Sequence, residues 1–292
     1  MKIIIAGGTG FIGQYLTEKF RKRGDQVLFI SRQSGHVSWV YNDLLNALEG
    51  SDLLINLAGR SINCRHTAAH RKEIINSRIQ STSALSDAVS GCKNPPKLWI
   101  NASATGIYKP SENIPATEVT TDFAGDFLAQ VVTDWEKVFF AVNHPKTRQV
   151  ALRTSVVLGK KGGAFSPLIF LSRFGFGGKQ GSGNQIFSWI HIEDYFGIIN
   201  YIFNNLRLNG VVNCTSPHPV TNKFLMETIR KNLNVKLGLP APVPMVKLGA
   251  FFIGTEASLI LNSSYILPEK LINSGFKFKF ASIESAIVDL IE

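Results

Sequence analysis

The first half of the chain alternates short apolar runs with longer segments whose apolar residues recur at helical spacing. This alternation is typical of strands joined by crossover helices, and it predicts an α/β fold with a doubly wound parallel sheet. The apolar runs predict strands at Lys2–Ala6, Gln26–Ile30, Leu53–Leu57, Leu98–Ala102 and Val150–Thr154. The periodic segments predict helices at Phe11–Arg23, Ala68–Ser90 and Phe123–Val142. Ligands are expected at the carboxyl ends of the strands, where the connecting loops gather.

After about Ser155 the pattern changes to Gly-rich and Pro-rich connections between shorter helical pieces. We therefore expect a first domain at residues 1–158 and a smaller C-terminal substrate or lid domain at residues 159–292. The strand-like Val211–Cys214 is expected to return to the main sheet, so parts of 186–215 would complete the first domain. The boundary is accordingly not a sharp one.

A glycine loop follows the first predicted strand, with Gly7, Gly10 and Gly13 at intervals of three. Glycine at these places allows a tight turn, a close approach to a pyrophosphate and close packing of helix on strand. The N-terminus of the next helix then offers free N–H groups to phosphates. The loop predicts a Rossmann-type dinucleotide site, with contacts from Gly7, Thr9, Gly10, Phe11, Ile12 and Gly13.

The second predicted strand ends at Ser31 and Arg32. An enzyme specific for NAD usually has an acidic residue there, which binds the ribose hydroxyls. A guanidinium and a hydroxyl are instead suited to a 2′-phosphate. We therefore expect NADP(H) to be preferred over NAD(H). The alternative is that Arg32 is only a solvated surface residue.

Composition and charge limit the other classes of function. The 292 residues are 45% apolar and 18% charged, as in a folded globular protein, and the formal net charge is +10. Basic charge attracts polyanions, but no recognition helix or aromatic-basic signature accompanies it, so we expect no nucleic-acid partner. Three separated cysteines indicate neither disulfides nor a metal site and favour a reducing cytoplasm. No apolar stretch approaches the length of a membrane span, and no membrane partner is expected.

Several further motifs resemble those of one protein family. The glycine loop, Ser31-Arg32 and Asp52-Leu-Leu-Ile-Asn-Leu-Ala-Gly59 are similar to those of extended short-chain dehydrogenases/reductases. The more specific matches to the atypical "epimerase family protein" branch are Lys72-Glu-Ile-Ile-Asn-Ser-Arg78, Ser103-Ala-Thr-Gly-Ile-Tyr108, Asp134-Trp-Glu136, Leu152-Arg-Thr-Ser-Val-Val-Leu-Gly159, Gly181-Ser-Gly-Asn-Gln185 and Ser188-Trp-Ile-His-Ile-Glu-Asp194. The resemblance runs from about Lys2 to Phe280 and implies an NADP-binding fold in a group whose substrates are largely undefined.

The resemblance also implies roles for individual residues. It assigns Ser31 and Arg32 to the adenosine phosphate. The other cofactor contacts that it implies are Leu57, Ala58, Gly59, Glu73, Arg78 and Val157. The chain departs from the family at Arg65-His66-Thr67, where Arg-Trp-Thr is frequent, and at Ile107-Tyr108, where two tyrosines often stand.

The Tyr-x-x-x-Lys pair that this superfamily usually employs is missing. Its lysine lowers the pKa of the tyrosine so that the phenol can exchange a proton with the substrate. Only Tyr15 has a lysine four positions later, Lys19, and both lie on the first helix. The helix expected to carry the pair has Phe127/Val131 or Leu128/Val132 instead. Neither apolar pair can move a proton.

Two hydroxyl groups remain as catalytic candidates near the expected nicotinamide edge. Ser103 follows the fourth strand and could bind a substrate oxygen, and Tyr108 on the same loop could act as an acid beside a cation. The alternatives are a loop hydroxyl that satisfies backbone groups and a ring packed on the cofactor edge. Both alternatives stay open.

Two charged segments invite a functional interpretation. Arg60–Arg78 is rich in basic residues and could bind anions, or it could be a solvated helix face. His191 and Asp194 do not have the spacing of a metal site, and a structural role for Asp194 near the next helix is favoured.

The sequence supports two functions of different classes. The favoured one is an NADP-dependent oxidoreductase or epimerase that acts on an unidentified small molecule. The alternative is a catalytically degenerate regulator or sensor that binds NADPH. The sequence defines neither the substrate nor the oligomeric state.

Overall fold

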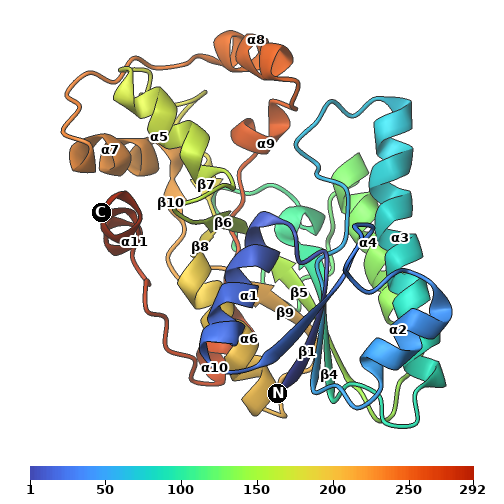
Figure 1. Cartoon of the computed structure of the whole chain (residues 1–292). Helices are drawn as coiled ribbons and strands as arrows, with labels where there is room; N and C mark the ends of the chain where they lie inside the picture. The colour runs from blue at the N-terminus through green and yellow to red at the C-terminus, as the bar shows by residue number, and fades with distance from the viewer.

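The computed structural model of the protein describes residues 1–252 and 254–292 (Figure 1). Its centre is a six-stranded parallel sheet in the order β2-β1-β3-β4-β5-β9. The strands are β1 (Lys2–Ala6), β2 (Gln26–Ile30), β3 (Leu53–Asn56), β4 (Leu98–Ala104), β5 (Arg148–Thr154) and β9 (Gly210–Cys214). The strand order changes direction between β1 and β3, which is the topological switch of a doubly wound sheet. The prediction of a Rossmann-type α/β fold is confirmed.

Helices cover both faces of this sheet (Figure 1). The helices α1 (Phe11–Lys22) and α6 (Ile192–Asn204) lie on one side, and α2 (Tyr41–Leu48), α3 (Ala68–Gly91) and α4 (Phe127–Phe139) lie on the other. The side chains of each strand point alternately to the two faces of the sheet, as in β1. Ile3 and Ile5 pack towards α1 and α6, whereas Ile4 and Ala6 pack towards α2 and α3. Burial on both faces explains why the strands are continuous apolar runs.

The helix α4 differs from its predicted range of Phe123–Val142. The carboxylate of Asp126 accepts a hydrogen bond from the Ala129 N–H at 2.9 Å, and this N-cap starts the helix at Phe127. Phe123 lies before the cap and pairs instead with Tyr108 in an isolated antiparallel bridge. Helical periodicity continues past both ends of α4, but the cap decides where the helix begins.

The C-terminal part has its own small core. Strands β6 (Val156–Leu158) and β8 (Trp189–His191) form one parallel pair, and β7 (Ile186–Phe187) and β10 (Val220–Thr221) form an antiparallel pair. The helices are α5 (Phe165–Arg173), α7 (Asn222–Asn232), α8 (Val243–Ile253), α9 (Ser258–Leu261), α10 (Glu269–Asn273) and α11 (Ile283–Ile291), and a 3₁₀ turn, η1, spans Thr105–Ile107. Buried residues of β6, β8, α5, α7 and α11 pack together in this core.

The start of α6 joins the sheet to the C-terminal segment. His191 is the N-cap of α6, because its Nδ1 accepts a hydrogen bond from the Glu193 N–H at 3.2 Å. The Asp194 carboxylate accepts hydrogen bonds from the N–H groups of Lys279 and Phe280 at 2.7 and 2.8 Å. The His191 ring is 1% exposed, and its centroid lies 3.9 Å from that of Phe280. Asp194 therefore supports the chain before α11, and the helix cap belongs to His191.

The buried His191 predicts a pH dependence of stability. Burial is the main cause that lowers its pKa from 6.5 to about 4. Below pH 6.5 the unfolded chain binds a proton that the folded chain takes up only near pH 4, so stability falls as the pH drops through this window. At pH 5 the loss due to this histidine is about 2 kcal/mol. His191→Asn keeps a capping acceptor and should lose about that much less stability between pH 7 and pH 5, as measured by urea unfolding. Equal losses in both proteins would contradict the prediction.

Candidate functional site

The glycine loop joins β1 to α1 at the topological switch of the sheet. Gly7 has a φ of +77°, and a Cβ on it would lie 2.8 Å from the carbonyl carbon of Leu57. A Cβ on Gly13 would lie 2.6 Å from the Cα of Gly8. At Gly10, in contrast, a Cβ would meet only the Gly7 carbonyl oxygen at 3.6 Å. The absence of a side chain at Gly7 and Gly13 therefore allows the strand, the loop and the helix to pack closely, whereas the space beside Gly10 is open.

The N-terminus of α1 begins at the same place, where Thr9 and Gly10 are exposed. Its N-cap is Gly10, and within the described residues no side chain caps the helix and no acidic residue lies in its first turn. The first N–H groups of a helix have no partner in the helix itself and attract anions. The open loop and the uncapped helix together form a cradle that fits a dinucleotide pyrophosphate.

Ser31 and Arg32 follow β2 next to this cradle. The hydroxyl of Ser31 lies 2.7 Å from Nδ1 of His36 and accepts a hydrogen bond from the Gln33 N–H at 3.0 Å. The side chain of Arg32 is exposed. Local contacts thus hold Ser31 in place, and Arg32 is exposed at the end of β2.

The other proposed cofactor contacts lie around the same edge. Leu57, Ala58 and Gly59 follow β3, and the Ala58 N–H donates to Oδ1 of Asn56 at 3.0 Å. A Cβ on Gly59 would lie 3.2 Å from the guanidinium carbon of Arg78. Val157 of β6 packs in the same hydrophobic cluster as Phe11 and Ile12, which places it beside the start of α1.

Arg78 and Glu73 lie on α3 in different electrostatic settings. Glu73 forms an ion pair with Arg60. The guanidinium of Arg78 lies over the Trp135 ring at 5.1 Å and donates to the carbonyl oxygens of Arg60 and Ile74, each at 3.0 Å. Burial lowers the pKa of Arg78 to about 10. A half-buried cation whose contacts are an aromatic ring and two neutral carbonyl oxygens is suited to an anionic ligand.

A buried ion pair lies under the carboxyl ends of β4 and β5. The guanidinium of Arg153 donates from Nε and Nη2 to the two carboxylate oxygens of Glu136 at 2.8 and 2.7 Å. The Ser103 hydroxyl donates to the same carboxylate at 2.5 Å. Ser103, Glu136 and Arg153 are 5%, 9% and 4% exposed. Burial alone would lower the pKa of Arg153, but the hydrogen bonds and charge of Glu136 outweigh it and raise this pKa.

Tyr108 belongs to the same network. Its hydroxyl accepts a hydrogen bond from Nη1 of Arg153 and donates to Oδ1 of Asn213, both at 2.8 Å. Burial is the main cause that raises the pKa of Tyr108, although Arg153 opposes the shift. The two catalytic candidates, Ser103 and Tyr108, are therefore linked through Arg153 and Glu136.

Strand register explains why these side chains meet. Ser103 of β4 is aligned with Arg153 of β5, which is aligned with Asn213 of β9. Aligned residues of neighbouring strands point to the same face of a sheet. Here they point to the face that α4 covers, where Glu136 lies. A charged residue within the apolar strand at Arg153 was the sequence signal that could have indicated a buried acidic partner.

The structure also decides between the two registers considered for α4. Val132 packs in one cluster with Tyr108 and Ile107, and Glu136, one turn later, contacts Ser103. The face of α4 at this edge therefore carries Leu128, Val132 and Glu136. The Tyr15–Lys19 pair lies elsewhere, since Lys19 forms an ion pair with Glu193 of α6.

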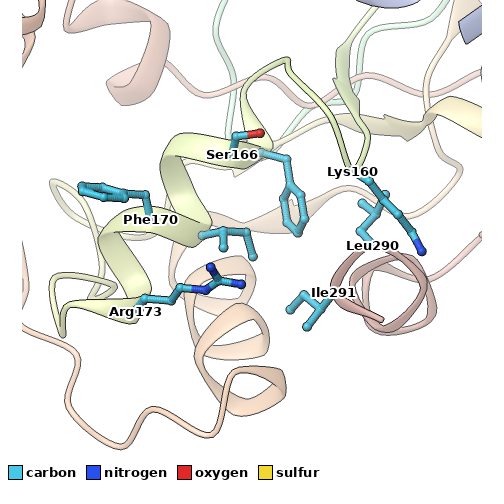
Figure 2. Close-up of a pocket in the computed structure, with 8 residues that line it drawn as sticks. Lys160, Ser166, Phe170, Arg173, Leu290 and Ile291 are labelled. Carbon is cyan, nitrogen blue, oxygen red and sulfur yellow. The ribbon is translucent and has the colours of Figure 1, made fainter.

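Two cavities flank the C-terminal helices. One, of about 580 Å³, lies between the loop before α3 and the helices α8 and α9, and its lining includes Arg65, His66 and Lys247. The other, of about 340 Å³, lies between α5 and α11 within the C-terminal part (Figure 2). The first adjoins α4, because the His66 ring lies 5.3 Å from that of Phe127.

Comparison with known proteins identifies the family. The family model described as "NAD dependent epimerase/dehydratase family" matches residues 3–215. The chain belongs to this family. A domain of unknown function, DUF1731, matches residues 241–290, so the family match is followed by a second module in the C-terminal part.

Individual family members cover the whole chain. The mouse (Mus musculus) "Epimerase family protein SDR39U1" is 35% identical over 100% of both chains. A crystal structure of the human epimerase family protein SDR39U1 (isoform 2) with NADPH is 32% identical, has a TM-score of 0.91 and covers 99% of both chains. A nucleoside-diphosphate sugar epimerase from Corynebacterium glutamicum is 28% identical, with a TM-score of 0.78 over 99% of this chain and 57% of its own. These relatives confirm the resemblance to the atypical "epimerase family protein" branch.

Metal-binding clusters and membrane-spanning helices are both absent from the part of the chain that the structure describes. There, no group of three or more His, Cys, Asp and Glu residues is arranged to hold a metal ion. Across the same residues, none of the helices has both the length and the apolar character needed to cross a membrane.

Proposed function

We propose that this protein is an NADP(H)-dependent oxidoreductase or epimerase that acts on an unidentified small molecule. The observation that carries the proposal is the cradle of Gly7, Gly10 and Gly13 at the uncapped N-terminus of α1. The NADPH in the human relative's structure supports it. In this proposal the N–H groups of Phe11 and Ile12 bind the pyrophosphate, and the backbone of Thr9 lies beside it.

The preference for NADP(H) over NAD(H) rests on the end of β2. Arg32 is exposed there, and the chain carries no acidic residue between Ser31 and Tyr41 that could accept bonds from a ribose diol. A guanidinium binds a phosphate through charge-assisted hydrogen bonds. Ser31 adds a hydroxyl beside it, and the half-buried Arg78 provides a second cation at the cofactor edge.

The Ser103–Glu136–Arg153 network is proposed to manage the proton of the reaction. A bound nicotinamide supplies or accepts a hydride. The only proton of the Ser103 hydroxyl is directed at Glu136, so Ser103 Oγ offers a lone pair to a substrate hydroxyl. As Oγ takes the substrate proton, Ser103 can pass its own proton to the Glu136 carboxylate. Arg153 holds that carboxylate in position through two hydrogen bonds.

Tyr108 is proposed to act as a positioning residue. Its hydroxyl is engaged by Arg153 and Asn213, which supports a role in orienting Arg153 rather than in direct contact with substrate. The substrate itself is proposed to enter from the cavity between the loop before α3 and α8–α9. The two cations in its lining, Arg65 and Lys247, outnumber its one carboxylate, Glu256, and this balance favours a substrate that carries negative charge.

One observation favours the second candidate, a cofactor-binding regulator. The face of α4 towards the site presents Leu128 and Val132, which cannot exchange protons. In that case NADPH would still bind in the cradle. Its binding would alter how the protein interacts with a partner, and no substrate would be converted.

The cofactor preference gives the first test of the proposed function. Arg32→Ala should weaken NADPH binding about 10-fold to 100-fold, since a charge-assisted contact to phosphate contributes about 1.5–3 kcal/mol. NADH binding should change little, because NADH has no 2′-phosphate. Fluorescence titration with both cofactors measures the two changes, with Arg207→Ala, a surface arginine after α6, as the matched control. Equal weakening for both cofactors would contradict the assignment of Arg32.

Turnover separates the two candidate functions. The purified protein should oxidise NADPH, or reduce NADP, with at least one compound from a panel of carbonyl compounds, or it should interconvert the epimers of at least one sugar nucleotide without net change of the cofactor. Ser103→Ala should lower that rate about 100-fold or more while NADPH still binds. NADPH binding without turnover over the whole panel would favour the regulator.

A further inference from the structure

The helix α8 carries apolar residues on two opposite sides. Val246 and Ala250 are 7% and 3% exposed and face the protein. On the other side Met245, Leu248 and Phe252 are 55%, 58% and 77% exposed. Their spacing of i, i+3 and i+7 places them in one stripe along the helix. A surface helix normally presents polar residues there, so this stripe requires an explanation.

The helix α5 shows the same arrangement. Phe165 and Ser172 are buried, whereas Phe170 and the following Phe174 are 62% and 65% exposed. The two exposed rings lie 4.9 Å apart. Figure 2 shows that Phe170 lies at the rim of the cavity between α5 and α11, whose lining it shares with Leu290. The outer stripe of α5 is therefore aromatic and faces solvent.

Backbone hydrogen bonds hold the segments that flank the two stripes side by side. The segment after α5 runs beside the segment before α8, since the Leu239 N–H donates to the Gly175 oxygen at 2.8 Å and the Gly181 N–H donates to the Ala241 oxygen at 2.8 Å. Figure 1 places α5 and α8 at the same end of the molecule. We call this surface the apolar lid face, and it consists of Phe170, Phe174, Phe176, Leu237, Leu239, Met245, Leu248 and Phe252.

The charges on this surface have one sign. Residues 165–181 and 236–252 contain no Asp or Glu. They contain Arg173, Lys179, Lys236 and Lys247, all of which are exposed. The apolar lid face is thus surrounded by cations without acidic neighbours in its own segments, and an anionic partner complements it.

We propose that the apolar lid face docks on the surface of an anionic phospholipid bilayer. Protruding Phe, Leu and Met side chains insert into the boundary of the acyl chains, while the surrounding Lys and Arg side chains bind lipid phosphates. A second copy of this chain fits less well, because a two-fold contact would oppose like charges. The absence of a long apolar stretch argues against a membrane span, and docking on a membrane surface requires no span.

Vesicle sedimentation tests this proposal independently of any turnover. The full chain should sediment with vesicles of phosphatidylglycerol and phosphatidylcholine, and it should remain in solution with phosphatidylcholine alone. Phe174→Ser/Phe252→Ser should lower the bound fraction about fivefold or more. The matched control is Val119→Ser/Leu206→Ser, since both of its residues are 77% exposed and lie outside the lid face. Its bound fraction should equal that of the unmodified chain.

Charge and oligomeric state give the remaining outcomes. Lys236→Gln and raised salt should each weaken vesicle binding, because the substitution removes an exposed cation and salt screens the attraction to a charged surface. Equal sedimentation with both vesicle types, or none with either, would overturn the proposal. A concentration-dependent dimer that Phe174→Ser/Phe252→Ser abolishes, without vesicle binding, would assign the face to a second copy instead.

Discussion

Glu136→Leu is expected to lower the free energy of unfolding by about 3–5 kcal/mol. The substitution leaves the Arg153 guanidinium buried without its carboxylate, and it removes the acceptor of the Ser103 hydroxyl. A buried charge without a partner is among the most destabilising changes that a single substitution causes. Urea unfolding followed by circular dichroism measures the loss.

Two further variants make this result specific. Glu136→Leu/Arg153→Met removes both charges and should lose clearly less stability than the sum of the two single variants. Glu18→Gln breaks an ion pair with Lys22 and should change stability little, because the side chains of Glu18 and Lys22 are 61% and 71% exposed. A loss for Glu136→Leu as small as that for Glu18→Gln would show that the network is not buried as described.

Gly10→Leu is expected to weaken NADPH binding about 100-fold or more, which corresponds to about 2.7 kcal/mol. A Cβ at this exposed position has room in the free protein, because it would meet only the Gly7 oxygen at 3.6 Å. The backbone at Gly10 has a φ of −77°, which any residue adopts, so the fold should keep its melting temperature. The leucine would, however, fill the space proposed for the pyrophosphate.

The matched control for this variant is Gly249→Leu. Gly249 lies on α8, and a Cβ added to it would meet no atom within 4 Å. Gly249→Leu should leave NADPH binding unchanged. Gly13→Leu, in contrast, should lower the melting temperature, because its Cβ would lie 2.6 Å from the Gly8 Cα. Unchanged NADPH binding by Gly10→Leu would place the cofactor elsewhere.

The sheet was predictable because both of its faces are buried. A strand between two layers of helices must be apolar at consecutive positions, and this is what marks β1 to β5 in the sequence. The helix α2 (Tyr41–Leu48) was missed, since it is short and buries only Leu44, Ala47 and Leu48. The short C-terminal helices leave a similarly weak pattern, because α5 and α8 carry apolar residues on their exposed sides too.

The glycine loop was predictable at residue level because its chemistry depends on the backbone of neighbouring positions. The buried network was not, because it depends on tertiary contacts between β4, β5, β9 and α4. Ser103 and Tyr108 were named from their place on one loop, whereas Glu136 and Arg153 were not recognised as their partners. Side chains alternate between the two faces of a sheet. Whether Ser103 and Arg153 point to the same face therefore depends on the register of β4 against β5, which the sequence does not give.

The most direct test of the proposed activity is a deuterium-transfer experiment. NADPH that carries deuterium at C4 of the nicotinamide, on one face or the other, is incubated with the protein and the small molecules of a cell extract. We predict that the unmodified protein transfers deuterium to at least one compound, detected by mass spectrometry. Gly10→Leu should abolish the transfer, and Ser103→Ala should reduce it about 100-fold or more. NADPH binding at the loop with neither deuterium transfer nor interconversion of the epimers of any sugar nucleotide would contradict an oxidoreductase or epimerase and would support the regulator.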